Sequence, residues 1–123
     1  MFGWFYDLLN RLDLRRERAK AVVNINQLSF TSRRGRTTKS MRWNEVRQID
    51  AGRTPTGLVE VFYAVLSDEH DSILVDDYYA GFAEFQTAVF EHWPEIETPW
   101  ARIFKGSPDV EEYVTLWKRR ECY

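Results

Sequence analysis

The chain has 123 residues, of which 44% are hydrophobic and 15% aromatic, and a net charge of −2. This length and apolar content predict a single folded domain over residues 1–123 and exclude an intrinsically disordered chain. The one cysteine, Cys122, excludes an intramolecular disulfide and argues against a cysteine-based metal site, which favours a reducing, cytoplasmic setting.

Residues 2–19 have the apolar spacing of an amphipathic helix, given by Phe2, Phe5, Leu8, Leu9 and Leu12. Trp4 widens this apolar surface, and basic residues gather at the C-terminal end, where they suit the helix dipole. We expect the segment to dock on the domain or to mediate dimerisation, with a membrane surface as the alternative. No secretory signal pattern is visible, and no apolar run reaches the roughly 18 residues of a spanning helix.

Residues 21–43 have the alternating pattern of a β-hairpin. Leu28 and Phe30 are predicted to share one face of the first arm. The turn is predicted at residues 33–36, because Gly35 can adopt the positive φ that a tight hairpin turn requires.

Two further strands are predicted after a tight connection at residues 44–46. Pro55-Thr56-Gly57 signals a turn, and residues 58–66 are rich in the Val, Phe and Tyr that favour strands. Apolar side chains occupy both faces of this strand, so we expect it to be central or covered. A polar turn at residues 67–71 joins it to a partner strand over residues 72–75.

Residues 79–93 are predicted to form a second helix, with an apolar stripe of Phe82, Phe85, Val89 and Trp93. Pro94 ends this helix. Residues 94–106 are then predicted to be a connector with apolar anchors, among them Trp100.

The pattern after the connector predicts a final helix. Ser107 suits the N-cap, Pro108 suits the first helical position, and the acids that follow suit the first turn. Basic residues supply the last turn, and one face carries Val110, Tyr113, Val114 and Trp117.

The small net charge hides a division along the chain. Residues 1–53 carry 12 Lys and Arg against 5 Asp and Glu, a net +7, whereas residues 54–104 carry 1 against 10, a net −9. Residues 105–123 carry 4 of each. These blocks either neutralise each other in the fold or form faces for an anionic and a basic partner.

The run Trp43-Asn44-Glu45-Val46-Arg47-Gln48-Ile49 resembles one that often opens the third strand of bacterial pleckstrin-homology-like (PH-like) domains. Residues 22–93 as a whole resemble such a domain. The resemblance implies an α+β fold in which a strongly bent antiparallel sheet, or partly open barrel, of seven strands is capped by the helix at 79–93. Five or six of these strands can be assigned from the sequence, and the extra N- and C-terminal helices, in 1–20 and 94–123, fall outside the resemblance.

Basic residues surround the predicted hairpin: Arg33, Arg34, Arg36, Lys39 and Arg42. In PH domains that bind phosphoinositides such residues hold the head group, so the resemblance implies a phosphate or lipid site at Arg33, Arg34, Arg36 and Lys39. Strand alternation places Lys39 on the face of Met41 and Trp43 but Arg42 on the other, which argues against one five-residue pocket. The alternative is a solvated hairpin whose charges discourage edge pairing. Nucleic acid is disfavoured by the acidic net charge and by the lack of a known motif.

The clusters that could carry chemistry favour structural roles. Asp68-Glu69-His70-Asp71 are consecutive residues in a turn, and such residues rarely converge on a metal. Asp76 or Asp77 suits a helix cap, and His92 near the helix end has no visible partner. No nucleophile, phosphate-loop or zinc-helix motif is present. We therefore predict no enzyme, no catalytic residues, no metal and no cofactor.

The function predicted from the sequence is a non-catalytic PH-like module that binds a protein partner or self-associates as a homodimer. The aromatic surplus motivates this prediction, with interface anchors at Trp4, Phe5, Trp100 and Trp117. One alternative is an adaptor that binds anionic lipid or phosphate through the basic hairpin at the membrane periphery. The other is a small acidic immunity-like inhibitor, whose segment 54–104 would face a basic partner.

Overall fold

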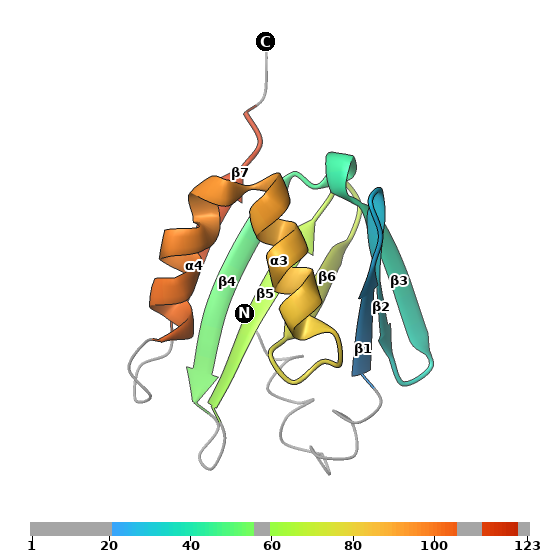
Figure 1. Ribbon diagram of the computed structural model, residues 1–123, viewed down its shortest axis with the longest axis horizontal. Helices are drawn as coiled ribbons and strands as arrows, with labels where there is room; N and C mark the ends of the chain where they lie inside the picture. Colours follow the sequence, from blue (N-terminus) through green and yellow to red (C-terminus); the bar gives the residue numbers. More distant parts are fainter. Residues whose placement is uncertain (1–20, 56–59, 106–111, 121–123) are drawn as a thin grey trace.

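The computed structural model describes residues 21–55, 60–105 and 112–120. In chain order the elements are β1 (Ala21–Ile25), β2 (Ser29–Arg34), β3 (Thr37–Arg42), the 3₁₀ helix η1 (Trp43–Glu45), β4 (Gln48–Pro55), β5 (Glu60–Ser67), β6 (Ser72–Asp76), α3 (Phe82–His92), the 3₁₀ helix η2 (Pro94–Ile96), α4 (Glu97–Phe104) and β7 (Glu112–Lys118). The strands form two antiparallel sheets, in the orders β1-β2-β3 and β6-β5-β4-β7 (Figure 1). Two α-helices accompany them in this part of the chain, so the fold is α+β.

The β2–β3 hairpin confirms the predicted turn. Arg34 pairs with Thr37 across a two-residue turn that begins with Gly35, whose φ is +60°. A glycine with positive φ at this position suits the twist of the flanking strands. The inward face of the hairpin is set by alternation from Phe30, which is buried and pairs with Met41.

Leu28 departs from the prediction because it lies in the β1–β2 turn rather than beside Phe30 on a strand. The side-chain oxygen of Asn26 accepts backbone N–H bonds from Leu28 and Ser29, both at 2.8 Å, and so closes the turn. Leu28 is left 76% exposed, an apolar side chain on the molecular surface.

β5 confirms the prediction of a central or covered strand. It lies between β4 and β6, where Ala64 pairs with Ala51 on one side and with Val75 on the other. Side chains on both of its faces are buried, among them Val61, Phe62, Tyr63 and Leu66. The alternation puts Phe62 and Leu66 in the hydrophobic core that the helices complete.

The helix predicted at residues 79–93 is confirmed as α3, although it begins at Phe82. The turn before it is joined to β1 by a backbone hydrogen bond from Val23 N–H to Ala80 O at 2.9 Å. α3 therefore lies over the space between the two sheets, where Phe85 is fully buried (Figure 1).

The connector predicted over residues 94–106 contains η2 and α4 instead. Pro99 lies in the first turn of α4, where a missing N–H removes no helical hydrogen bond. Trp100 is 1% exposed and donates its indole N–H to the side-chain oxygen of Gln86 at 2.8 Å. Trp100 is thus a core residue that joins α4 to α3, and it offers almost no surface to serve as the predicted interface anchor.

The prediction of a C-terminal helix is wrong where the structure describes the chain. Residues Glu112–Lys118 form β7, which pairs with β4 at the edge of the four-stranded sheet, with a register shift that makes Leu116 a bulge. The segment is rich in β-branched and aromatic residues, which favour strands, and the edge of β4 pairs with it. The predicted cap and acidic turn at residues 107–111 lie outside the described residues.

The predicted N-terminal helix, including Trp4 and Phe5, lies outside the described residues, as do Thr56 and Gly57 of the predicted turn. Within the described ranges, no helix combines the length and the apolar character needed to cross a membrane. The interface roles predicted for Trp4 and Phe5 therefore stay predictions.

Seven strands are described, the number that the PH-like resemblance implies. They form two sheets, and no ladder joins β3 to β6 within the described residues, so no barrel is closed. α4 and β7 follow α3 in the chain. The structure therefore confirms an antiparallel α+β fold and leaves the PH-like assignment as a proposal.

Candidate functional site

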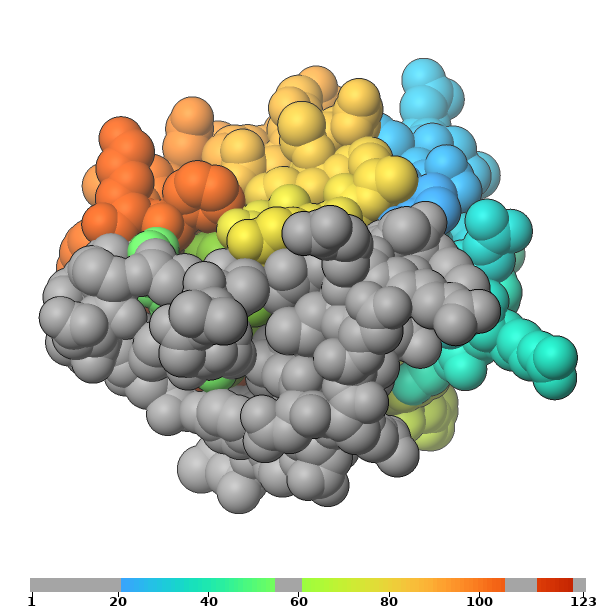
Figure 2. Space-filling model, turned by 90° about the horizontal axis from the view of Figure 1, so that it is seen from below, coloured from blue at the N-terminus to red at the C-terminus, as the bar shows by residue number. Residues whose placement is uncertain are grey.

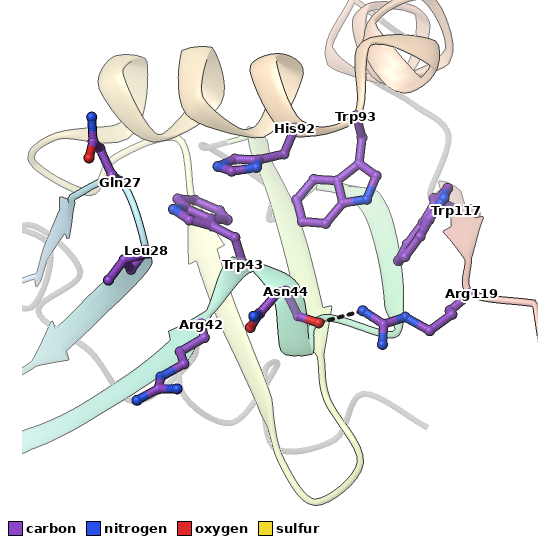
Figure 3. Close-up of a pocket in the computed structure, with 9 residues that line it drawn as sticks. All are labelled: Gln27, Leu28, Arg42, Trp43, Asn44, His92, Trp93, Trp117 and Arg119. Atoms are coloured by element: carbon purple, nitrogen blue, oxygen red, sulfur yellow. Dashed lines mark hydrogen bonds between the residues drawn. The ribbon is translucent and has the colours of Figure 1, made fainter.

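A groove with a volume of about 440 Å³ opens among elements that are distant in the sequence (Figure 3). Its wall comes from the β1–β2 turn, from the end of β3 with η1, from the end of α3, and from β7 with the residue after it. Three tryptophans, a histidine, a leucine, two arginines and two amides line it, with no carboxylate, thiol or hydroxyl side chain among the described lining residues. The lining of the groove is therefore dominated by aromatic, cationic and amide side chains.

Two tryptophans form the buried floor of the groove. Trp43 and Trp93 are 3% and 7% exposed, and their ring centroids lie 6.2 Å apart with an edge-on orientation. The ring of Trp117, which is partly buried, lies 5.3 Å from that of Trp93. The three indoles come from η1, from the end of α3 and from β7, so the tertiary fold alone brings them together.

The orientation of Trp43 is fixed by the β1–β2 turn. Its indole N–H donates to the backbone oxygen of Asn26 at 3.0 Å, and its backbone N–H donates to the oxygen of Leu28 at 3.0 Å. Both partners belong to the turn that Asn26 closes, so the floor and this wall are held as one unit.

His92 covers one face of Trp43 at the C-terminal end of α3. The two rings are stacked, with centroids 4.8 Å apart and planes inclined by 26°. His92 is exposed, so its imidazole combines a flat surface with polar nitrogens at the mouth of the groove.

Arg119 bounds the groove beside Trp117 (Figure 3). Its Nη2 donates to the backbone oxygens of Asn44 and Val46 at 2.6 and 2.9 Å, and its backbone N–H donates to Arg47 O at 2.8 Å. Neutral carbonyl groups thus hold the guanidinium in place without cancelling its positive charge.

Arg42 supplies a second cation at the rim. Its Nε lies 4.0 Å from the carboxylate of Glu45, and the two side chains are 72% and 60% exposed. An ion pair this long and this exposed contributes little, so Arg42 keeps most of its charge for a ligand.

Among the groove residues, the sequence predicts Trp117 as an interface anchor, but on a helix. The structure places Trp117 on β7, and its interface role stays a prediction. Trp93 and His92 were assigned to a helix stripe and a helix end, and Arg119 to a cationic last turn. The sequence feature that could have indicated the groove is the surplus of aromatic residues, together with the cations at residues 118–120.

Strand alternation separates the four basic residues predicted to bind phosphate. Arg34 and Lys39 share the inward face with buried Ser32, whereas Arg33 lies on the outward face and Arg36 in the exposed turn. Figure 2 shows the hairpin, in teal, projecting from one side of the molecule. The structure therefore brings two of the four residues together and not the other two.

Arg34 and Lys39 line a second cavity, of about 330 Å³, between β3 and β6. The Arg34 guanidinium lies 5.9 Å from the centre of the Tyr79 ring, and Lys39 Nζ donates to the Asp71 carboxylate at 3.0 Å. Burial raises the pKa of Tyr79, and the charge of Arg34 opposes part of that rise. Each cation of this cavity thus already has a partner.

The acidic turn between β5 and β6 has a structural explanation. The Asp68 carboxylate accepts backbone N–H bonds from His70 and Asp71 at 2.8 and 2.7 Å, the pattern of an Asx turn. The hydrogen bond from Lys39, together with one from the Ser72 backbone, lowers the pKa of Asp71. No three His, Cys, Asp or Glu side chains gather as metal ligands anywhere in the described part of the chain.

Comparisons of the chain with protein families, curated proteins and solved structures found no match. The class of protein is therefore defined by its own geometry. It is an antiparallel α+β protein with an aromatic groove bounded by arginines.

Proposed function

We propose that the protein is a non-catalytic interaction module that binds a segment of a protein partner in the groove. The observation that carries the proposal is the groove itself, which exposed Leu28 and His92 line together with the partly buried ring of Trp117. Apolar side chains that are exposed together mark partner-binding surfaces, and Trp and Arg are enriched where such surfaces bind most strongly.

The fixed geometry of the groove supports this proposal. Trp43 and Arg119 are both held by backbone carbonyl groups, so neither side chain needs to be ordered by a ligand. A preorganised surface loses less conformational entropy on binding and therefore keeps more of its interaction energy as affinity.

Selection of a random displayed peptide library against the full chain tests the proposal. We expect peptides that bind the wild type and lose at least about tenfold in affinity, or 1.4 kcal/mol, in the Leu28→Asp variant. Leu28 is exposed, so this change disturbs the groove without disturbing the core. Thr38→Asp adds the same charge at an exposed position of β3 and should leave binding unchanged. A selection that yields no peptide, or peptides that bind both variants equally, contradicts the proposal.

We also propose that the fold is a divergent PH-like one. The run from Trp43 to Ile49 carries the resemblance, and its three apolar residues, Trp43, Val46 and Ile49, are all buried. Seven antiparallel strands and the position of α3 at the junction of the sheets add support. Superposition of an experimental structure on PH domains is the test. Both sheets and α3 should align in one arrangement, and alignment of a single hairpin alone would contradict the proposal.

A phosphate or anionic-lipid adaptor is the second candidate function. The alternation of β2 and β3 favours it, because Arg34, Lys39 and the hydroxyls of Ser32 and Thr37 line one cavity. Arg34 Nε is buried and has no hydrogen-bond partner in the described residues. Guanidinium and ammonium groups beside hydroxyls are suited to phosphate oxygens.

Flotation with neutral and acidic liposomes at low and high salt tests the second candidate. Acidic liposomes should capture the wild type in a salt-sensitive manner, and Arg34→Glu should abolish capture. Arg33→Glu reverses the same charge on the outward face and is the matched control. An equal loss in the two variants would indicate general charge attraction, and no capture would remove the candidate.

A further inference from the structure

The charge of the groove is one-sided. Arg42 and Arg119 are the two arginines that line it, and Lys118 and Arg120 flank Arg119 in the sequence. Glu45, Asp68 and Glu69 line a separate cavity with Arg119, and none of the three lines the groove. An aromatic groove can also hold a cation over its rings, but the arginines oppose that occupant and favour a negatively charged one.

Arg119 retains hydrogen-bonding capacity for such a ligand. Both of its side-chain bonds use Nη2, to Asn44 O and Val46 O, so Nε–H and Nη1 have no recorded partner among the described residues. A carboxylate that meets either nitrogen gains a charge-assisted bond to a group whose position is already fixed.

The end of α3 gives the groove a direction. α3 ends at His92, and the C-terminal end of a helix carries a partial negative charge. A carboxylate is therefore disfavoured beside His92 and favoured at the opposite side, where Arg119 and Trp117 lie (Figure 3). The flat and apolar surfaces of His92, Trp93 and Leu28 suit an apolar side chain instead.

We propose that the partner segment is an acidic peptide in which Asp or Glu lies close to a large apolar or aromatic residue. The acid contacts Arg119, and the apolar residue packs on Trp93 and His92 beside Leu28. The side-chain amides of Gln27 and Asn44, which also line the groove, are available to the peptide backbone. This inference rests on the proposed function and names the chemistry of the partner.

The displayed-library selection tests the inference through the sequences that it enriches. Peptides whose binding is lost in Leu28→Asp should share an Asp or Glu near a Phe, Trp, Tyr, Leu or Ile. Changing that acid to its amide in a synthetic peptide should weaken binding to the wild type by at least about tenfold. This comparison leaves the protein unaltered, so it does not depend on the folding of a variant.

The matching change in the protein is Arg119→Met, which removes the charge and keeps an apolar stem. In this variant the acidic peptide and the amide peptide should bind with the same affinity. Arg120→Met removes an equal charge from a residue outside the groove lining and should preserve the preference for the acid.

Three outcomes distinguish the two proposals. Both proposals are supported if the selected peptides lose binding in Leu28→Asp, prefer the acid over its amide, and lose that preference in Arg119→Met. Groove-dependent peptides without an acid preference overturn the inference on partner chemistry and leave the interaction module standing. The absence of any groove-dependent peptide overturns both.

Discussion

Gly81 occupies a position that no other residue can take without strain. Its φ is +88°, and a Cβ atom there would collide with the carbonyl oxygen of Val23 in β1. We expect Gly81→Ala to lower the free energy of unfolding by about 3 kcal/mol, because both the backbone conformation and the space are unfavourable.

Gly35→Ala is the matched control for this prediction. Gly35 also has a positive φ, but a Cβ atom there meets nothing within 4 Å. This variant should lose only about 1 kcal/mol. Urea unfolding of both variants measures the difference, and equal losses would show that the close approach of Gly81 to β1 is unimportant.

Asp50 is a buried carboxylate that no sequence motif distinguishes. It is 3% exposed, and it accepts hydrogen bonds from Gln48 Nε2 at 3.0 Å and from the Tyr113 hydroxyl at 2.6 Å. We expect Tyr113→Phe to lower stability at neutral pH by about 1–2 kcal/mol, because it removes one of these donors from a buried charge. Urea unfolding against the wild type measures the loss, and an unchanged midpoint would contradict the prediction.

Tyr113 also predicts a pH dependence. Partial desolvation, and then the hydrogen bond to Asp50, raise the pKa of Tyr113 above its ordinary value of 10.0. The neutral phenol is favoured in the folded state, so its contribution is complete below about pH 10 and is lost as the pH rises through the raised pKa. Stability should therefore fall more steeply above about pH 10 in the wild type than in Tyr113→Phe. Parallel slopes in urea unfolding across that range would contradict this expectation.

At the scale of elements, the bond between Gln86 and Trp100 joins α3 to α4. The indole N–H of Trp100 is buried and finds its acceptor in the side chain of Gln86. Gln86→Leu should cost about 1–2 kcal/mol, because it leaves a buried donor without a partner. Gln86→Glu keeps an acceptor oxygen and should cost less, as thermal or urea unfolding can measure. A larger loss in Gln86→Glu would contradict this interpretation.

The ion pair of Lys39 and Asp71 joins the edge strand β3 to the β5–β6 turn. The side chains are 43% and 53% exposed, so we expect Lys39→Met to cost less than about 1 kcal/mol at neutral pH. The hydrogen bond from Lys39 lowers the pKa of Asp71 below its ordinary value of 3.8. The contribution is therefore complete above that value and is lost as the pH falls through the lowered pKa. The difference between wild type and variant should vanish in strong acid, and a constant difference in urea unfolding would contradict the assignment.

β7 and α4 show why some elements were predicted wrongly. Residues near 107–118 carry a helix cap, acids and then cations, which are the local signals of a helix, but these signals are worth less than pairing with β4. The sequence predicts a connector in place of α4 because Pro94 indicates a break, and Pro99 is tolerated because it lies in the first turn of α4. Both errors reflect tertiary context that single-residue preferences do not contain.

At the scale of the whole molecule, the elements predicted correctly are those whose signals are local. The Gly35 turn, the strand β5 and the helix α3 each have a pattern contained in a short stretch of sequence. The groove has no such pattern, since its tryptophans come from η1, from the end of α3 and from β7. Strand alternation places Arg34 and Lys39 on the opposite face of the hairpin from Arg33. This separation was partly predictable, because alternation also predicts that Lys39 shares a face with Met41.

The bond between Arg119 and Asn44 joins residues 75 positions apart in the chain. During synthesis, the turn and η1 that form one wall of the groove leave the ribosome long before β7 does. Contacts of such long sequence separation close late in folding. A nascent chain that stops before residue 112 therefore contains Trp43 and Trp93 but lacks Trp117 and Arg119, so the groove that we propose as a binding site is complete only after its last wall has been made.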